Sequence, residues 1–333
     1  MTPMTDPGIL VVGDANVDLV LTGDVVPRFG QEEQLLDASS LVLGSSAGIV
    51  AHGLARLGVP VALVACVGDD EFGRFTLAAL DGVDTSFVRV VPGETTGLSV
   101  ILSAPEDRSI LTAKGAMVRV TAADVLAAAD AGAFTHVHFA SFFLLPGLAA
   151  SLPTLLPELR SRGLTVSLDT NWDPAGEWLG LDAVLPHVDV FLPNLEELRA
   201  VSPGHDSDEQ AAAALVDVSP GLAVVVKAGR DGGWSVRSGS PILSAPGLVL
   251  DVVDTTGAGD SFDAGYLAAL HFGETDERIR LRWATAAGSL STRVAGGSGA
   301  HATRDEIAAH LDLSAPTPTP TPVPASTTAA ATA

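Results

Sequence analysis

Cysteine, lysine and aromatic residues are scarce in this chain of 333 residues, and no long apolar run is present. The single cysteine, Cys66, cannot form an internal disulfide, and its place in the apolar run Val61–Val67 predicts a buried, reduced thiol. No apolar run approaches the roughly 18–20 residues that span a bilayer. Met1–Gly8 has no basic region ahead of an apolar one, so no signal peptide is visible. These absences predict a cytoplasmic protein that does not cross a membrane.

Basic residues are also few, because 18 lysines and arginines stand against 40 acidic residues and give a net charge of −22. Such a chain offers no basic surface for nucleic acid or for anionic membranes. It can still bind an anionic ligand, since backbone N–H groups and a few local cations hold phosphate inside acidic proteins. The only lysines are Lys114 and Lys227, so each is a candidate for such a local role.

Apolar runs of strand length alternate with alanine-rich segments of helical pattern along most of the chain. This order is typical of an α/β fold in which helices cover both faces of a mainly parallel sheet. The predicted strands are Ile9–Val12, Val61–Val67, Phe134–Ala140, Thr165–Asp169, Val188–Leu192 and Leu222–Lys227. The predicted helices lie near Ala47–Leu57, Phe72–Leu80, Ala122–Ala129, Leu148–Arg162 and Asp208–Val218.

Two stretches, Val17–Val42 and Thr95–Ala113, interrupt this alternation. Each has the pattern of short β segments joined by glycine, proline and charged turns, without a helix between them. They could pair into a small β flap outside the main sheet or form surface hairpins without a role, and the pattern alone does not decide between the two. The C-terminal segment Ser314–Ala333 carries no charge and repeats proline, so we predict a disordered tail.

The segment Asp251–Tyr266 carries the strongest functional signal, and an apolar-periodic run, Phe262–Leu270, leaves it. Gly257-Ala258-Gly259 therefore lies where a loop becomes a helix, and small residues there let a ligand approach unpaired helical N–H groups. Asp260 falls in the first helical turn, where the helix dipole favours its ionised form. An ionised carboxylate beside an anion-binding turn suits a base that deprotonates a hydroxyl attacking a phosphoryl group.

Other interpretations remain open on residue types alone. Asp254 and Asp260 could be ordinary loop and N-cap residues around a tight turn. Two better-known phosphate signatures are absent, since neither lysine is followed by serine or threonine and no Gly-x-Gly-x-x-Gly follows the first strand. We expect His136 and His138, which alternate on a strand-like run, to point to opposite faces and therefore not to share a metal.

The segment Asp254-Thr255-Thr256-Gly257-Ala258-Gly259-Asp260 resembles the signature of the ribokinase-like, or PfkB, carbohydrate kinases. Four further stretches resemble motifs of that family in the right order: Gly13-Asp14-Ala15-Asn16-Val17-Asp18, Val67-Gly68-Asp69-Asp70-Glu71-Phe72-Gly73, Pro193-Asn194-Leu195-Glu196-Glu197 and Lys227-Ala228-Gly229-Arg230-Asp231-Gly232-Gly233. The resemblance extends from about Gly8 to about Leu313. It implies a ribokinase-like, three-layer α/β/α kinase domain over residues 8–313, with a mostly parallel central sheet and a small β-sheet lid formed by residues 17–42 and 95–113.

The resemblance also implies a role for each matched residue. Asp260 would be the general base, with Gly257, Ala258 and Gly259 as the anion hole. Sugar hydroxyls would be bound by Asp14, Asn16, Asp18, Gly44, Ser45 and Gly48. The nucleotide would be bound by Asn194, Lys227, Gly229, Gly232, Thr255 and Thr285, with Lys114 a weaker candidate near the flap. Glu197 would position Mg²⁺ with phosphates and water, and Asp254 and Thr256, near Ser291–Gly296, could hold a monovalent cation such as K⁺.

The sequence departs from the family pattern at the presumed sugar pocket. The family usually has Gly-Gly and then, three residues on, a small residue and asparagine, whereas this chain has Gly44-Ser45-Ser46-Ala47-Gly48-Ile49. Ile49 cannot hydrogen-bond a hydroxyl, and a buried sugar hydroxyl left unpaired would cost about 1–3 kcal/mol. We therefore expect an acceptor that differs from ribose at that edge or is less polar there.

The function expected from the resemblance is transfer of the γ-phosphoryl group of MgATP to a hydroxyl, preferably primary, of a small sugar or sugar acid. Lid closure would exclude water, and the lid could also serve as a homodimer interface. Asn194 and Glu197 could instead only cap a helix, because asparagine followed three residues later by glutamate is a capping pattern. Two other functions stay open: a nucleoside kinase, which would need aromatic residues that make up only 5% of the chain, and a catalytically silent binding protein.

Overall fold

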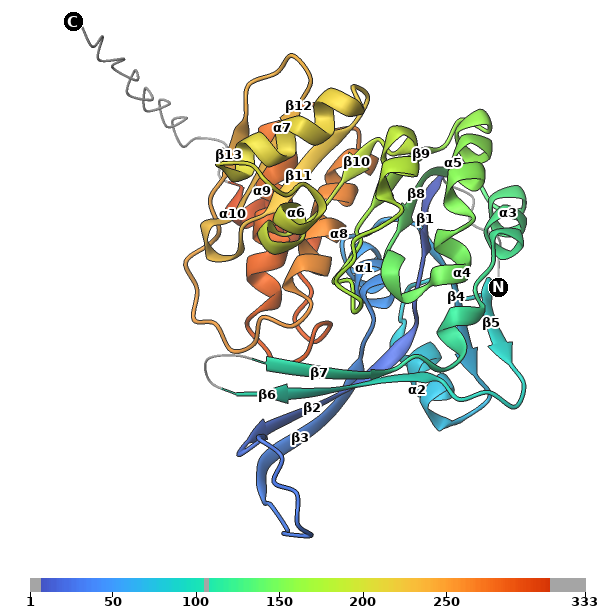
Figure 1. Ribbon diagram of the computed structural model, residues 1–333, viewed down its shortest axis with the longest axis vertical. Coiled ribbons are helices and arrows are strands. Elements are labelled where there is room, and N and C mark those ends of the chain that lie inside the picture. Colours follow the sequence, from blue (N-terminus) through green and yellow to red (C-terminus); the bar gives the residue numbers. More distant parts are fainter. Residues whose placement is uncertain (1–6, 105–107, 312–333) are drawn as a thin grey trace, which may run out of the picture.

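The structure is a computed structural model that describes residues 7–104 and 108–311 (Figure 1). Its main sheet has the strand order β13-β12-β11-β10-β9-β8-β1-β4-β5. The strands are β1 (Gly8–Val12), β4 (Val61–Gly68), β5 (Val88–Val91), β8 (Phe134–Phe139), β9 (Thr165–Leu168), β10 (Val190–Phe191), β11 (Ala223–Lys227), β12 (Gly233–Arg237) and β13 (Leu243–Ala245). All pairings are parallel except those of β12 with β11 and β13. The prediction of a mostly parallel α/β sheet is confirmed.

Two hydrophobic cores lie on opposite faces of this sheet, because alternate residues of each strand point to opposite sides. In β1, Ile9 and Val11 join one core, and Leu10 and Val12 join the other. The first core packs against α1 (Ser46–Arg56), α8 (Ala258–His271), α9 (Glu277–Ser291) and α10 (Arg304–His310). The second packs against α3 (Ala122–Ala131), α4 (Pro146–Ala149), α5 (Leu152–Ser161), α6 (Leu195–Val201) and α7 (Asp208–Val218). The result is a three-layer α/β/α arrangement.

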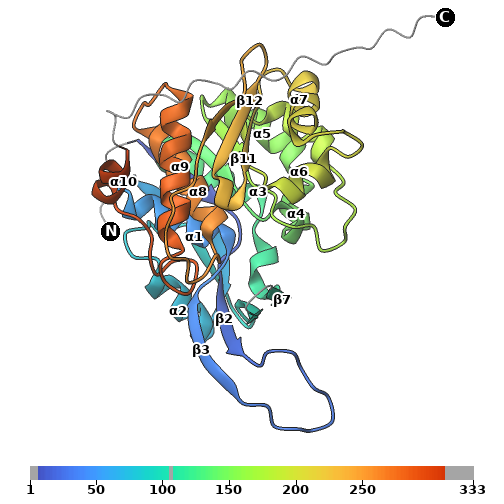
Figure 2. The same cartoon turned by 90° about the vertical axis from the view of Figure 1, so that its left-hand side faces the viewer.

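A second sheet with the order β3-β2-β6-β7 lies at the carboxyl end of β1 (Figure 1). It consists of β2 (Asn16–Gly23), β3 (Leu36–Leu43), β6 (Gly97–Ser103) and β7 (Arg108–Ala113), with β2 and β6 parallel and both outer pairs antiparallel. Figure 2 shows β2 and β3 projecting away from the body of the molecule. The two stretches that interrupt the strand and helix alternation therefore pair with each other, and the β flap, not the independent hairpins, is the correct interpretation. We call this sheet the lid.

Short helices complete the chain: α2 (Glu71–Ala79) and the 3₁₀ segments η1 (Gly115–Arg119), η2 (Phe142–Leu144), η3 (Leu181–Ala183), η4 (Leu185–His187) and η5 (Gly229–Asp231). The predicted helix Leu148–Arg162 is wrong in one respect, because it is broken into α4 and α5. Pro153 explains the break, since it has no N–H and its ring would clash with the carbonyl four residues earlier. The predicted strand Val188–Leu192 is reduced to the two residues of β10.

Cys66 is buried in β4, as predicted. Within residues 7–104 and 108–311, no helix combines the length and the apolar character needed to cross a membrane. The predicted tail, Ser314–Ala333, lies outside the described residues.

Candidate active site

The candidate site lies where the strand order of the main sheet reverses. β1 pairs with β4 on one side and with β8 on the other, so the chain segments that leave these neighbouring strands diverge at their carboxyl ends. Such a switch point is where parallel α/β sheets bind ligands. Asp14 follows β1, Ser141 follows β8 and Asn171 follows β9, so polar residues from three strands meet there.

The glycine-rich turn begins α8. Gly257 is its N-cap with φ of 70°, and a Cβ at Gly257 would come within 2.6 Å of Gly297 Cα, so only glycine fits. The Ala258 N–H donates to the Thr255 carbonyl at 3.2 Å, which uses one of the N–H groups expected to be unpaired. Among the described residues no hydrogen bond takes the N–H groups of Gly259 and Asp260. These two donors are therefore available to an anion at the helix start.

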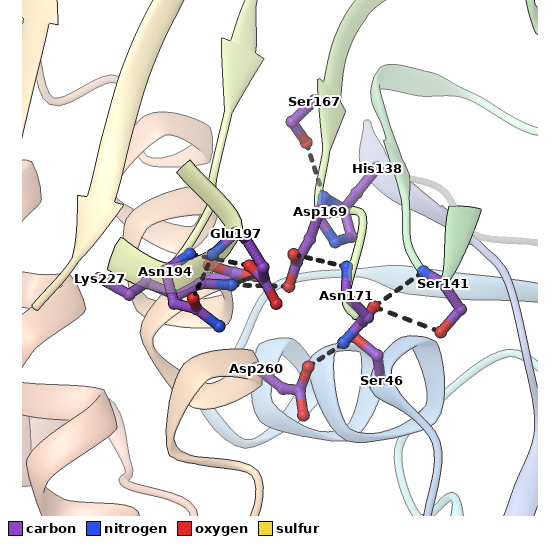
Figure 3. Close-up of polar contacts among 11 residues, drawn as sticks. Ser46, His138, Ser141, Ser167, Asp169, Asn171, Asn194, Glu197, Lys227 and Asp260 are labelled. Atoms are coloured by element: carbon purple, nitrogen blue, oxygen red, sulfur yellow. Dashed lines mark hydrogen bonds and ion pairs between the residues drawn. The ribbon is translucent and has the colours of Figure 1, made fainter. Parts of the chain in front are cut away.

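Asp260 lies in the first turn of α8, and its Oδ1 accepts a hydrogen bond from Ser46 Oγ at 2.5 Å (Figure 3). Burial, and next the negative charge of Asp169, raise the pKa of Asp260 to about 6, although Ser46 and Lys227 act in the opposite direction. Desolvation is thus the largest effect on the pKa of Asp260, and it opposes the ionised form that the helix dipole is expected to favour. A carboxylate with this pKa is ionised at neutral pH and basic enough to accept a proton.

Lys227 turns into the protein and forms two buried ion pairs, with Asp169 at 2.7 Å and with Asp263 at 3.2 Å. Although burial opposes it, the charge of Asp169 raises the pKa of Lys227, so the ammonium group stays protonated. Burial raises the pKa of Asp263 well above its usual value, and Lys227 with the other contacts lowers that of Asp169. The lysine cation thus pairs with two buried carboxyl groups whose pKa values are shifted in opposite directions.

Asn194 and Glu197 form a reciprocal capping box at the start of α6. The Asn194 N–H donates to Glu197 Oε2 at 2.8 Å, and the Glu197 N–H donates to Asn194 Oδ1 at 2.9 Å. The capping interpretation is thus confirmed, and it leaves the second carboxylate oxygen of Glu197 for another role. Figure 3 shows both side chains beside Lys227 and Asp169.

The acidic cluster of Glu197 and Asp169 fits a magnesium ion that is held largely through phosphates. Burial and then the charge of Asp169 raise the pKa of Glu197 to about 7, so these carboxylates repel one another when all are ionised. A nearby divalent cation would relieve that repulsion. Among the described residues, no three His, Cys, Asp or Glu side chains are arranged to hold a metal by themselves. Coordination by one carboxylate, waters and phosphates is therefore the arrangement that this donor set suits.

Three polar residues of the first motif are buried where β1 leads into the lid. Asp14 Oδ1 accepts a hydrogen bond from the Ala47 N–H at 3.1 Å, and Asn16 Nδ2 donates to Ser99 Oγ at 3.2 Å. Asn16 Oδ1 has no partner among the described residues although it is buried. Burial, then Asp14 and Asp260, raise the pKa of Asp18 to about 7. Buried polar groups left unsatisfied are costly, so this group is arranged to bind a polar ligand.

Gly44 and Ser45 shape this pocket in different ways. A Cβ at Gly44 would lie 2.1 Å from Asp18 Oδ1, so only glycine admits the Asp18 carboxylate. Ser45 keeps a backbone with φ of 69°, which a side chain seldom adopts, and its hydroxyl accepts from the Gly48 N–H at 3.1 Å as the N-cap of α1. The Ser45 hydroxyl, predicted to bind the acceptor, therefore also caps α1 and keeps its own proton to donate. Gly48 supplies the N–H that this cap binds.

Ile49 is buried, and its side chain lies against the backbone of Gly297 next to the Gly257 turn. It fills the space between α1 and the loop that supports the turn. The apolar residue at this position thus has a packing partner inside the protein.

Asp254 joins two loops that were predicted to lie together. Its Oδ1 accepts from the Thr256 N–H at 2.9 Å and from Thr256 Oγ1 at 2.8 Å, and its Oδ2 accepts from the Gly296 N–H at 2.9 Å. Although burial opposes it, these bonds and the charge of Arg108 lower the pKa of Asp254. The ionised carboxylate therefore anchors the loop before the turn to the loop after α9.

The remaining predicted nucleotide residues lie at the η5 turn, in the loop before α8 and in α9. Gly229 and Gly232 flank η5, where the Ala228 N–H donates to the Gly232 carbonyl at 2.9 Å. Thr255 is exposed before the turn. Thr285 is buried in α9, and its hydroxyl donates to the Arg282 carbonyl at 3.2 Å. Lys114 is the N-cap of η1, between the lid and the main sheet.

The prediction for the two histidines is wrong. Residues two apart on a strand share a face, and both His136 Nε2 and His138 Nδ1 lie within hydrogen-bond distance of Ser167 Oγ, at 2.7 and 2.8 Å. Burial lowers the pKa of His136 to about 4 and that of His138 to about 3, so both rings are neutral. With Ser167 they form a buried polar stripe on β8 and β9, and Figure 3 shows His138 and Ser167 near Asp169.

Several residues of the site were not predicted: Ser46, Ser141, Asp169, Asn171, Asp263 and Arg108. Asn171 Oδ1 accepts from the Ser141 N–H at 2.9 Å, and both residues have positive φ angles, 54° and 58°. Such backbone conformations often mark functional sites. The available signal was Asp169-Thr170-Asn171, a polar stretch at the carboxyl end of a predicted strand.

Comparison with known proteins agrees with this geometry. Residues 6–303 match the model of the pfkB family carbohydrate kinases. The chain is 30% identical over 303 residues to the ribokinase of Bacillus subtilis, covering 90% of this chain and 97% of that one, and 31% identical over 319 residues to a fructokinase of Klebsiella pneumoniae, with the same coverage. The structure of Arabidopsis thaliana ribokinase complexed with ribose and ATP superposes with a TM-score of 0.78 at 26% identity, covering 93% of this chain and all of that one. The chain has the ribokinase-like fold and belongs to the pfkB family of carbohydrate kinases.

Proposed function

We propose that this kinase transfers the γ-phosphoryl group of MgATP to a hydroxyl, preferably primary, of a small sugar or sugar acid. The observation that carries the proposal is Asp260, a partly buried carboxylate with a pKa of about 6 in the first turn of α8. It stands between the unpaired N–H groups of the turn and the buried polar residues Asp14 and Asp18, whose charges interact with its own.

In the proposed step, Asp260 accepts the proton of the acceptor hydroxyl while the oxygen of that hydroxyl forms the bond to the γ-phosphorus. The bond between the γ-phosphorus and the bridging oxygen breaks, and ADP leaves. The N–H group of Gly259, in the Gly257–Gly259 turn, and that of Asp260 next to it receive the charge on the transferred phosphoryl group. Asp14, Asn16 and Asp18, with the Gly44–Gly48 segment, would hold the acceptor.

The nucleotide would lie across α6, the η5 turn, the loop before α8 and the middle of α9. We assign its contacts to Asn194, Lys227, Gly229, Gly232, Thr255 and Thr285. Lys227 retains one ammonium proton beyond its two ion pairs, which can bind a phosphate oxygen. Glu197 would hold the magnesium ion, which neutralises charge on the phosphates when it is bound.

A monovalent cation is a further part of the proposal. The loop of Asp254 and Thr256 is tied to the loop at Gly296, and backbone carbonyls of such loops are suitable ligands. A fructokinase of Vibrio cholerae, which shares the fold with a TM-score of 0.76, is known in a form with fructose, ADP and a potassium ion bound. K⁺ activation of this chain can be tested by replacing K⁺ with the larger tetramethylammonium ion.

We also propose a homodimer formed through the lid, and a cytoplasmic location where ATP is available. Large apolar side chains are exposed on the lid and its connecting loop, including Phe29, Leu35, Ile110 and Leu111. Exposed apolar groups on one sheet are typical of an interaction surface.

A nucleoside kinase is the second candidate, and one observation favours it. Four aromatic residues form a chain of edge-to-face contacts, Phe142–Phe143–Trp178–Trp172, with ring centroids 4.9 to 5.2 Å apart. Phe142 and Phe143 directly follow Ser141, and Trp172 directly follows Asn171. An aromatic cluster at this edge could stack on a base.

An ATP-consumption screen over sugars, sugar acids and nucleosides tests these functions. Asp260→Asn should abolish turnover of the compound that the wild-type protein phosphorylates, while Asp305→Asn, an exposed aspartate in the first turn of α10, should leave turnover unchanged. Turnover of nucleosides alone would replace the sugar kinase by the second candidate. Intact turnover in Asp260→Asn would contradict the assigned base.

A further inference from the structure

An arginine of the lid reaches the loop that begins the anion-binding turn. Arg108 is the first residue of β7, and its Nη1 donates a hydrogen bond to Thr256 Oγ1 at 3.3 Å. Thr256 immediately precedes Gly257. The contact joins residues 148 apart in the sequence, so it exists only because the lid folds against the carboxyl end of the main sheet.

The charge of Arg108 acts on both sides of the site. It lowers the pKa of Asp254, in the loop before the turn, and it opposes the rise in the pKa of Asp18, in the first strand of the lid. The guanidinium group therefore lies close enough to influence the acceptor side and the turn together.

Positive charge is scarce where the reaction would place negative charge. Asp14, Asp18 and Asp260 are acidic, and the one lysine beside the turn, Lys227, already pairs with Asp169 and Asp263. Phosphoryl transfer spreads negative charge over three equatorial oxygens. A guanidinium group matches that arrangement, because it binds phosphoryl oxygens through two parallel N–H bonds.

We propose that Arg108 contacts the phosphoryl group in transit, so that the lid contributes a catalytic cation as well as a cover. This inference rests on the proposed kinase function. Thr256 holds the guanidinium group over the turn, and the transferred group lies between the arginine and the N–H groups of Gly259 and Asp260. Because Arg108 belongs to the lid, it would stabilise the transition state only when the lid lies over the acceptor.

The test compares Arg108→Ala and Arg108→Lys with the wild-type kinase, using neutral and acidic acceptors found in the screen. Removing a donor to transition-state charge lowers kcat by about a hundredfold or more, so Arg108→Ala should lose about that much with every acceptor, while the KM for ATP stays within about threefold. Arg108→Lys should recover about tenfold of the loss, because it restores the charge without the planar fork. Added guanidinium chloride at millimolar concentration should partly restore Arg108→Ala and should not restore Asp260→Asn.

Arg74→Ala is the matched control, since Arg74 is an exposed arginine on α2 that pairs with Glu71. It should leave kcat unchanged. An undiminished kcat in Arg108→Ala would overturn the inference while leaving the kinase function intact. A loss confined to acidic acceptors would also overturn it, because Arg108 would then bind the acceptor. A loss of kcat in Arg108→Ala that guanidinium does not restore would overturn the inference, because Arg108 would then only hold the lid against Thr256. Absence of turnover in the wild-type protein would contradict both the kinase function and this inference.

Discussion

Ser46 Oγ lies 2.5 Å from Asp260 Oδ1 and joins the N-termini of α1 and α8, two helices whose first residues are more than 200 positions apart. The hydroxyl donates to the ionised carboxylate and so lowers the pKa of Asp260 against the larger effect of burial. Ser45 caps α1, which carries Gly48 and Ile49, so this single bond connects the proposed acceptor side of the site to the proposed base.

Activity should depend on the ionisation of Asp260. Because the base must be unprotonated and its pKa is about 6, we expect kcat/KM to fall as the pH decreases through about 6. Ser46→Ala removes the hydroxyl that lowers this pKa, so the acid limb of the profile should move to higher pH. Ser240→Ala, at an exposed turn, is the control and should leave the profile in place. An unmoved limb in Ser46→Ala would show that another group sets the profile.

Asp260 should reduce the stability of the folded protein at neutral pH. Its folded-state pKa of about 6 lies above the usual 3.8, so the folded state binds the proton more tightly than the unfolded chain. The stabilisation that this tighter proton binding gives the folded state is fully present below pH 3.8 and is lost as the pH rises through about 6. Asp260→Asn, which stays neutral, should be more stable than the wild-type protein at pH 8 by about 1–3 kcal/mol. Urea unfolding at acid and alkaline pH measures the free energy of unfolding of both proteins. A difference between Asp260→Asn and the wild-type protein that does not change with pH would contradict the prediction.

Ser45→Gly should stabilise the protein. The φ of 69° at Ser45 costs about 1–3 kcal/mol for a residue with a side chain, whereas replacing a serine N-cap by glycine costs only a few tenths of a kcal/mol. We expect a gain of about 1 kcal/mol in the free energy of unfolding. Ser207→Gly is a matched control, because Ser207 caps α7 through the same kind of bond with an extended backbone, φ of −146°. It should be slightly destabilising. A loss of stability in Ser45→Gly would mean that the cap outweighs the strain.

The buried trio around Lys227 should respond unequally to substitution. Lys227→Met leaves the Asp169 charge buried without its partner, which costs about 3–5 kcal/mol. Asp263→Asn should cost less than about 1 kcal/mol, because burial raises the pKa of the Asp263 carboxyl well above its usual value and Asp169 still pairs with Lys227. Denaturant unfolding of both variants measures whether Lys227→Met loses more stability than Asp263→Asn. Equal losses would show that Asp263 is ionised in the folded protein.

The sequence predicted the parts of the site that are local. Gly257-Ala258-Gly259-Asp260 forms a loop that becomes a helix because small residues, a glycine with positive φ and an apolar-periodic run follow one another directly. The same local logic identified the capping pattern of Asn194 and Glu197. The prediction for His136 and His138 was wrong, because residues two apart on a strand share a face, and both side chains lie on the same face of β8.

The partners of Asp260 could not be predicted in this way, because they come from distant segments. Ser46 and Asp169 reach it only when α1 and β9 take their places at the carboxyl edge of the sheet. Arg108 reaches Thr256 only when the lid pairs β2 with β6. No spacing in the sequence encodes these distances, since each depends on which strands become neighbours.

By itself, the sequence determined the α/β class, the glycine turn at a helix start and the carboxylate in the first turn of that helix, since hydrophobic periodicity and glycine chemistry act over a few residues. Only the tertiary structure decided that this carboxylate has a pKa of about 6, that the lysine of the site is paired and that a lid arginine lies over the turn. The physical reason is that desolvation and charge pairing depend on what surrounds a group in space, which is set by the folded chain as a whole.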